Sequence, residues 1–217
     1  MAEGHAEAAR SQPMTAPSPR ADFLELMGEA LVGAVDREPS STFGVWRDGT
    51  LAFVSGGWSR MAFDNNGAQV LREWPLGRSV WEAVPDVLQG HYRDLWRRVL
   101  ESQEACEHEY ECSSPERKRI YRMQLHPLTS EGLLIRNQLV VDLPRQDPGA
   151  ALRPEIYASD AGFLTMCANC RRVRRALEPA AWDWVPDLVR APPARLSHGL
   201  CEPCLEIYFP EGGPRSL

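Results

Sequence analysis

The chain has 217 residues, of which 43% are hydrophobic and 25% charged, and its net charge is −6. This balance is ordinary for a globular protein with one medium domain and a smaller unit, and it does not favour a nucleic-acid binder. No apolar run reaches the length of a membrane span, and residues 1–20 lack the apolar centre of a secretory signal. We therefore expect a cytoplasmic protein in a reducing compartment, with no membrane partner.

The N-terminal part of the chain changes character near residue 21. Residues 1–20 are rich in Ala, Pro, Ser and Glu, and we expect them to be disordered. Apolar residues then recur at helical spacing over 22–35, which predicts an amphipathic helix. This helix could pack on the domain that follows it, or it could pair with a second copy of itself.

A hairpin is predicted next. Two short apolar runs, 43–46 and 51–54, flank an Asp-Gly pair, which is favoured chemistry for a tight antiparallel turn. Ser55 can cap a short helix after the hairpin, and a clear apolar period predicts a longer helix over roughly 86–102.

Three strands are predicted after these helices, over 105–112, 120–125 and 132–141. The first alternates strictly, so its glutamates should face water while Cys106, His108, Tyr110 and Cys112 share the other face. His108 could ligate a metal or haem there, whereas the cysteines also fit a half-buried sheet face. Two strands, several helices and three strands indicate an α+β fold, an antiparallel sheet with helices on one face.

Several segments of this region resemble motifs of the PAS domain family. They are Trp-Arg-Asp-Gly-Thr at 46–50, Val-Ser-Gly-Gly-Trp at 54–58, Gly-Arg-Ser-Val-Trp at 77–81, and 119–128 with its closing Pro-Leu. They follow the family's order over roughly 40–142. The resemblance implies a five-stranded sheet that cups helices around a pocket for ligand sensing or protein contact. From the resemblance and the apolar pattern, the pocket candidates are Phe53, Trp58, Met61, Trp81, Leu95, Tyr110 and Met123.

The remaining chain divides into a linker, a cysteine-containing module and a tail. Residues 143–162 contain several Pro and no periodic pattern, so we interpret them as a linker after a domain over 21–142. A compact module is expected over 163–210, and 211–217 form a tail.

The module contains two C-x-x-C pairs, Cys167 with Cys170 and Cys201 with Cys204. Zinc prefers a tetrahedron of thiolates, and each C-x-x-C turn can supply two neighbouring ligands. A site closed by four cysteines has no open coordination position, which favours a structural Zn²⁺ over a catalytic one. His198 could replace a cysteine as ligand, or it could support the site from outside.

Other chemistry remains open for the same cysteines. They could be reduced buried thiols or two redox pairs, although a thioredoxin-type C-x-x-C normally follows a strand in a βαβ unit and neither pair shows one. A c-type haem site needs His directly after the second cysteine, where Arg171 and Leu205 stand. Beyond Cys204, apolar residues at 205–209 can cover the site.

This module resembles a tail that follows PAS-type modules in bacterial signalling proteins, with the pattern C-x-x-C-[KR]-[KR]-[VI]-R…W…[ST]-H-G-[ILV]-C-x-x-C. The matching residues are Cys167, Cys170, Arg171, Arg172, Val173, Arg174, Trp182, Ser197, His198, Gly199, Leu200, Cys201, Pro203 and Cys204. The resemblance implies a zinc-binding module attached to a sensor.

The sequence contains no catalytic signature, so we expect no enzyme. The leading hypothesis is a non-enzymatic PAS-like sensory or protein-interaction module of bacterial signal transduction, with structural zinc. An unidentified small molecule could occupy its pocket, and its output would pass to a protein partner or through a homodimer.

The alternative is a nucleic-acid-associated transcriptional regulator that uses Arg171–Arg175, a run that could also be solvated or pair with the acidic strand. The third is a thiol redox or zinc-dependent enzyme.

Overall fold

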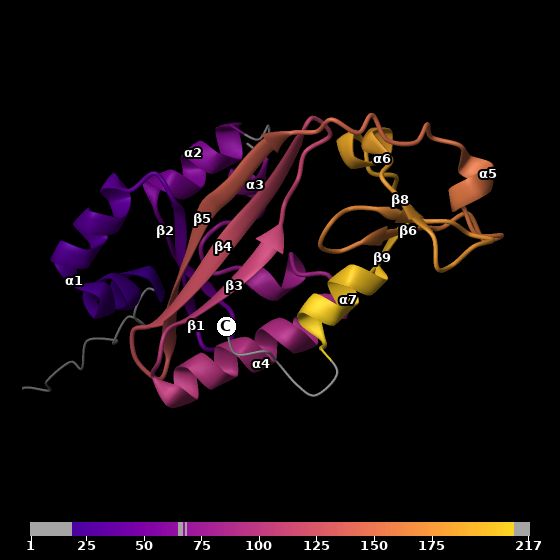
Figure 1. The fold of residues 1–217 in the computed structure, drawn as a ribbon. Coiled ribbons are helices and arrows are strands. Elements are labelled where there is room, and N and C mark those ends of the chain that lie inside the picture. The colour runs from indigo at the N-terminus through magenta and orange to yellow at the C-terminus, as the bar shows by residue number, and fades with distance from the viewer. Residues whose placement is uncertain (1–18, 65–66, 68, 211–217) are drawn as a thin grey trace, which may run out of the picture.

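The computed structural model describes residues 19–64, 67 and 69–210, so the segment 1–18 and the tail 211–217 lie outside the described residues. Two units lie side by side in Figure 1. We call residues 41–144 the sheet domain and residues 145–210 the cysteine unit, and helix α1 flanks the sheet domain.

The sheet domain contains the predicted order of hairpin, helices and three strands. In chain order its elements, with α1 before them, are α1 (Pro19–Arg37), β1 (Ser41–Trp46), β2 (Leu51–Val54), α2 (Gly56–Asp64), α3 (Val70–Glu73), a 3-10 turn (Val80–Glu82), α4 (Asp86–Ser102), β3 (Cys106–Glu111), β4 (Arg117–Pro127) and β5 (Gly132–Pro144). The strands form one sheet in the order β2-β1-β5-β4-β3, with antiparallel pairing throughout. The predicted α+β class is therefore confirmed.

Helices lie on both faces of this sheet, whereas the sequence pattern indicated helices on one face, because the flanking helix α1 packs on the outer face. The inner face packs against α4, because strand residues such as Val45, Leu125 and Ile135 share one buried cluster with α4 residues. The outer face of β1, β2 and β5 packs against α1, where Phe23 is fully buried beside Leu134. Figure 1 shows α1 and α4 on different sides of the strands. The sequence left open whether the N-terminal helix packs on its own domain or pairs with a second copy of itself. In the structure it packs on its own domain.

Helix α1 is not the single straight helix that the apolar period predicts. Gly28 has φ 73° and ψ 153°, which breaks the helical path in the middle of the element. Glycine tolerates this conformation because it has no Cβ. The break lets the part before it and the part after it bury different side chains, including Phe23 and Val35, against the same sheet.

The cysteine unit is a small second layer with its own core. Its elements are α5 (Pro154–Tyr157), β6 (Leu164–Cys167), β7 (Val173–Arg174), β8 (Trp182–Asp183), α6 (Pro186–Arg190), β9 (Leu196–Gly199) and α7 (Glu202–Tyr208). The strands form a sheet in the order β8-β7-β6-β9, in which β6 and β9 are parallel. Tyr157, Trp184 and Leu188 are buried in its centre.

The segment 143–162 differs from the predicted linker. Strand β5 continues to Pro144, and α5 lies within the segment. Tyr157 is only 3% exposed and donates a hydrogen bond of 2.9 Å to Asp183. The sequence did not reveal these ordered and buried residues, because the buried positions of this proline-rich segment do not repeat with a helical or strand period.

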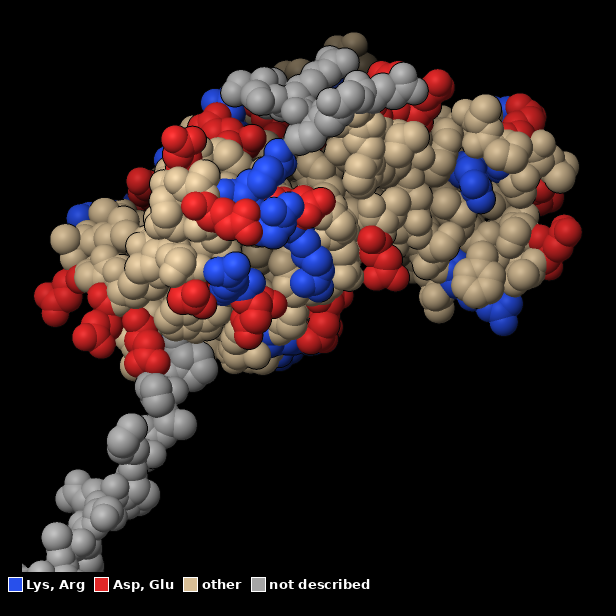
Figure 2. Space-filling view, turned by 90° about the horizontal axis from the view of Figure 1, so that it is seen from below, with Lys and Arg blue, Asp and Glu red and all other residues tan. Residues whose placement is uncertain are grey.

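The described helices include none that is both long and apolar enough to cross a lipid bilayer. Figure 2 shows basic and acidic side chains interspersed on the face seen from below, where α4 lies in Figure 1. Arg97 of α4 illustrates this, since it pairs with both Asp94 and Glu101. On this face the described residues form no continuous area of a single charge (Figure 2).

Candidate functional site

The structure brings the two predicted C-x-x-C pairs together. The sulfur atoms of Cys167, Cys170, Cys201 and Cys204 all lie within 4.8 Å of one another, and all four residues are buried. We call this group the sulfur cluster. The first pair leaves the end of β6, and the second lies at the start of α7, so the parallel pairing of β6 with β9 aligns the two turns.

The donor set fits a tetrahedral zinc ion. The Sγ atoms of Cys170 and Cys201 are 3.5 Å apart, and a tetrahedron with Zn–S bonds of about 2.3 Å requires sulfur separations of about 3.8 Å. All six cysteines of the chain are free thiols. Four buried thiols at this spacing are a donor set that a divalent cation such as zinc could occupy.

The pKa values of the four thiols also favour a bound cation. Thiol hydrogen bonds from Cys170 lower the pKa of Cys167, whereas the same contact raises the pKa of Cys170. The pKa of Cys201 is lowered to about 7, while that of Cys204 is raised by its contact with Cys167. Ionisation of Cys167 and Cys201 is therefore favoured and that of Cys170 and Cys204 is opposed, so a bound cation would be needed to hold all four deprotonated.

Asn169, between the first two cysteines, connects the sulfur cluster to the sheet domain. It is 7% exposed, and its Nδ2 donates to Sγ of Cys204 at 3.2 Å. Its Oδ1 accepts the backbone N–H of Glu111 at 2.8 Å and the hydroxyl of Tyr208 at 3.2 Å. One amide thus joins the cluster, strand β3 and helix α7.

Tyr208 extends this connection into the core of the sheet domain. It is 3% exposed, belongs to the buried cluster of α4, and its hydroxyl lies 3.4 Å from that of Tyr92. Burial raises the pKa of both hydroxyls, so both remain neutral hydrogen-bonding groups near neutral pH. The other apolar residues expected to cover the site are not buried; Leu205, Ile207 and Phe209 are between 45% and 57% exposed.

Two histidines lie next to Tyr208. His91 of α4 bonds through Nδ1 to the backbone oxygen of Tyr208 at 3.0 Å, and its ring centre is 5.1 Å from that of His108 on β3. The Nε2 atoms of both rings are buried and have no partner among the described residues. Burial lowers the pKa of His108 to about 4. His108 therefore packs against α7 at the junction of the two units, and it is not part of the sulfur cluster.

A partly buried ion pair forms a second connection. Arg145 lies 2.9 Å from Glu111, their side chains are 14% and 16% exposed, and the guanidinium also stacks 3.5 Å from the ring of Trp184. Glu111 therefore does not face water, in contrast to the expectation for the glutamate face of this strand. The end of β3 is covered by the cysteine unit, whereas Glu107 and Glu109 are exposed as expected.

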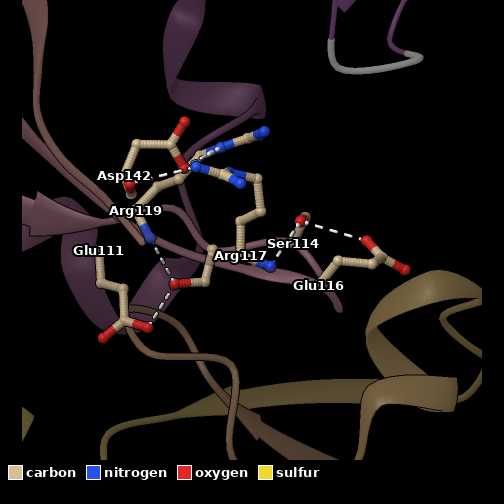
Figure 3. Close-up of polar contacts among 7 residues, drawn as sticks. Glu111, Ser114, Glu116, Arg117, Arg119 and Asp142 are labelled. Atoms are coloured by element: carbon tan, nitrogen blue, oxygen red, sulfur yellow. Dashed lines mark hydrogen bonds and ion pairs between the residues drawn. The ribbon is translucent and has the colours of Figure 1, made fainter. Parts of the chain in front are cut away.

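Figure 3 shows how the turn between β3 and β4 is fixed beside this ion pair. Ser113 donates to Glu111 at 2.5 Å and accepts the backbone N–H of Arg119 at 3.1 Å. Both Arg117 and Arg119 pair with Asp142 of β5. The cysteine unit contacts this turn region through Asn169, which accepts the N–H of Glu111, and through Arg190, which pairs with Glu116.

A cavity of about 620 Å³ opens between this turn, helix α2 and the cysteine unit, and we call it the α2 cavity. Its floor includes Tyr121, which shares the inner sheet face with Leu125 further along β4. The cysteine unit contributes Arg171, Val189 and Arg190 to its wall.

The structure distributes the predicted pocket residues over several places. Trp58 and Met61 line the α2 cavity. Leu95 and Tyr110 line a second cavity, of about 550 Å³, beside α7. The others are packed side chains, namely Trp81 and Met123 in the core against α4 and Phe53 in the cluster under α1.

The residues of the arginine run, 171–175, lie in different surroundings, and His198 lies apart from the cysteines. Arg171 lines the α2 cavity, whereas Arg175 pairs with Asp183 at 2.7 Å and with Glu178 at 3.3 Å. His198 lies on β9 outside the sulfur cluster and is largely exposed, and partial desolvation of its ring by neighbouring groups lowers its pKa.

The interaction made by Asn169 was not anticipated from the sequence, since nothing in a C-x-x-C motif indicates which way its intervening side chains point. The burial of Tyr208 could have been found. It follows Cys204 by four residues on α7, and such residues share one helix face.

A family model matches part of the sheet domain. Residues 60–138 match the family model described as a PAS fold. Similar solved structures include the PAS domain of Bordetella pertussis BvgS, with 16% identity, a TM-score of 0.42, and coverage of 55% of this chain and 88% of that one. The photoactive yellow protein domain of the sensor histidine kinase Ppr from Rhodospirillum centenum has 16% identity, a TM-score of 0.36, and coverage of 54% and 96%.

The PAS domain of an HTR-like protein from Haloarcula marismortui has 17% identity, a TM-score of 0.33, and coverage of 56% and 98%. No curated protein matches the chain. The matched segment contains α4, β3, β4 and most of β5, which build the inner face of the five-stranded sheet. The sheet domain is therefore a PAS-fold domain, and it is followed by a small unit with a buried four-cysteine cluster.

Proposed function

We propose that this protein is a non-enzymatic sensory or protein-interaction module of bacterial signal transduction, in which a zinc-stabilised cysteine unit docks on a PAS-fold domain and reports its state. The observation that carries the proposal is the junction itself. Asn169 bonds at once to the sulfur cluster, to β3 and to α7. A change on the inner face of the sheet can therefore alter how the cysteine unit docks.

Zinc has a structural part in this proposal. Cys167, Cys170, Cys201 and Cys204 would hold the ion, and its positive charge would keep their sulfurs deprotonated. The ion would fix the turn that contains Asn169 and the start of α7. The output would pass to a protein partner or to a second copy of the chain.

The α2 cavity is the proposed place for a small molecule. It lies on the inner face of the sheet and is walled partly by the cysteine unit, so an occupant would contact both units. Its volume of about 620 Å³ is within the usual range of about 300–1,000 Å³ for small-molecule pockets.

Native mass spectrometry of the purified full chain tests the composition that the proposal requires. We expect one zinc per chain, and the same spectra report any co-purified small molecule and the number of chains per particle. A chain that carries no metal in any preparation would contradict the structural part assigned to zinc.

Hydrogen exchange of matched variants tests the docking. Tyr208→Ala should release α7 and raise amide exchange in α7 and in β3, because Tyr208 fills the core beside Tyr92. Ile207→Ala is the control on the same helix, since Ile207 is 57% exposed. Equal exchange in both variants would show that the cysteine unit does not dock through Tyr208, and the proposed route of communication would fail.

A further inference from the structure

The α2 cavity has an apolar interior with a basic rim. Trp58, Met61 and Val70 line it from α2 and α3, and Tyr121 lines it from the sheet. Three arginines also line it, from β4 and from the cysteine unit, against a single glutamate. An apolar cavity with a few convergent charged groups is the usual form of a site for a small organic ion.

The three arginines differ in how their charge is balanced. Arg119 pairs with Asp142, and Arg190 pairs with Glu116 and Asp187. Arg171, in contrast, forms no ion pair with a carboxylate in the described part of the chain.

The guanidinium of Arg171 contacts Sγ of Cys112 at 3.9 Å, and both residues line the cavity. Cys112 belongs to the edge strand region of the sheet domain, so this side chain reaches from one unit to the other. Its charge is thus available to a bound anion at the boundary between the units.

The backbone holds Arg171 in this position. Its φ is 62°, in the left-handed region that favours glycine, and its N–H donates to the backbone oxygen of Cys167 at 3.1 Å. The turn of the first cysteine pair therefore fixes the point from which the arginine side chain leaves the cysteine unit.

We propose that the α2 cavity binds an organic carboxylate with an apolar body, and that Arg171 of the cysteine unit binds its carboxylate. This inference rests on the proposed sensory function and specifies its ligand class. The apolar body lies against Trp58 and Met61 of the sheet domain, while the guanidinium fork of Arg171 matches the two carboxylate oxygens. Such a ligand bridges the two units and stabilises their docked arrangement.

Three naphthalene probes of one shape test the charge requirement on the full, zinc-loaded chain. They are 2-naphthoate, 2-naphthalenemethanol and 2-naphthalenemethylammonium, measured by isothermal titration calorimetry. We expect the carboxylate to bind at least about tenfold more tightly than the alcohol, because only the carboxylate forms a charge-assisted, two-oxygen contact with the guanidinium of Arg171. The ammonium should bind most weakly.

Variants then test the assigned residue. Arg171→Gln should lower the affinity for 2-naphthoate about tenfold or more and leave the affinity for the alcohol unchanged. Glutamine has the same left-handed backbone cost as arginine, so the substitution adds no strain. Arg172→Gln is the control, because Arg172 is exposed and does not line the cavity.

The outcomes separate this inference from the proposed function. No measurable binding of 2-naphthoate, equal affinity for acid and alcohol, or an unchanged Arg171→Gln variant would each overturn the carboxylate site. Ala62→Trp places a large ring in the cavity and should abolish binding of every probe. If acid and alcohol bind equally and Ala62→Trp removes both, the cavity remains a ligand pocket and only the carboxylate inference fails. If Ala62→Trp leaves 2-naphthoate binding intact, the probe binds elsewhere, and both the inference and the cavity's proposed sensory part fail.

Discussion

The backbone N–H of Glu111 donates a hydrogen bond of 2.8 Å to Oδ1 of Asn169, and this bond ties strand β3 to the turn between the first two cysteines. The side-chain amide of Asn169 also donates, through Nδ2, to Sγ of Cys204. Asn169 therefore joins, through its one side chain, a cysteine of the sulfur cluster to the edge strand of the PAS-fold sheet. The proposed coupling between the units depends on this short path.

Asn169→Ala should destabilise the protein by about 1–3 kcal/mol, because it leaves the N–H of Glu111 buried without an acceptor. Urea unfolding followed by tryptophan fluorescence measures the loss. Gln138→Ala is the control, since Gln138 is exposed on β5. A loss no larger than that of the control would show that the bond to Glu111 contributes little to docking.

The ion pair of Arg145 and Glu111 should contribute more than a surface pair. Their side chains are 14% and 16% exposed, so solvent screens their attraction less. A double-mutant cycle with Arg145→Met and Glu111→Gln should give a coupling energy above about 1 kcal/mol. The exposed pair of Arg47 and Glu131, with side chains 52% and 64% exposed, is the reference and should couple by less than about 0.5 kcal/mol. Similar coupling energies for both pairs would contradict the account.

The half-buried His108 should make the stability depend on pH. Burial lowers its pKa to about 4 in the folded protein, below the ordinary value of 6.5. As the pH falls below 6.5 the unfolded chain takes up the proton first, so stability should fall from pH 7 towards pH 4, by up to about 3 kcal/mol. The lowered pKa of His91 acts in the same direction.

His108→Phe keeps an aromatic ring against Tyr208 and removes the titrating group. Unfolding free energies of the variant and the natural chain, measured in urea between pH 7 and pH 4, should therefore diverge at low pH in favour of the variant. Parallel pH profiles would mean that His108 does not titrate differently in the folded state.

Gly49, in the turn of the β1–β2 hairpin, and Gly77, just before the 3-10 turn at Val80–Glu82, are a matched pair of glycines with positive φ. Gly49 has φ 91°, and a Cβ there would lie 2.1 Å from Nε1 of Trp81, which donates to the backbone oxygen of Asp48. Gly77 has φ 93°, but its Cβ would meet no atom within 4 Å. Gly77→Ala should cost about 1–2 kcal/mol from the backbone alone, and Gly49→Ala at least about 1 kcal/mol more. Equal losses in thermal unfolding would show that Trp81 adapts without cost.

Much of the fold could be predicted because local chemistry agrees with it. The Asp-Gly pair sets the hairpin, and the apolar period of 86–102 coincides with α4. The clustering of the four cysteines could also be predicted, since two C-x-x-C turns can close around a single ion.

The junction could not be predicted, for physical reasons. Asn169 and Glu111 are 58 residues apart, and polar side chains in a turn or on a strand are ordinarily solvated. Their burial results from the docking of two units, which no local period encodes. For the same reason the pocket candidates were dispersed, since apolar residues such as Phe53 and Trp81 carry the same pattern on either face of the sheet.

Metal removal with hydrogen-exchange mass spectrometry tests the central claim most directly. Structural zinc contributes about 10 kcal/mol or more to the folding of small cysteine units, so chelation of the zinc-loaded chain should unfold 163–210. Exchange should rise there and at the amide of Glu111, while α4 and the inner strands stay protected. A native chain without zinc, or one in which chelation leaves the exchange of the cysteine unit and of Glu111 unchanged, would contradict the account.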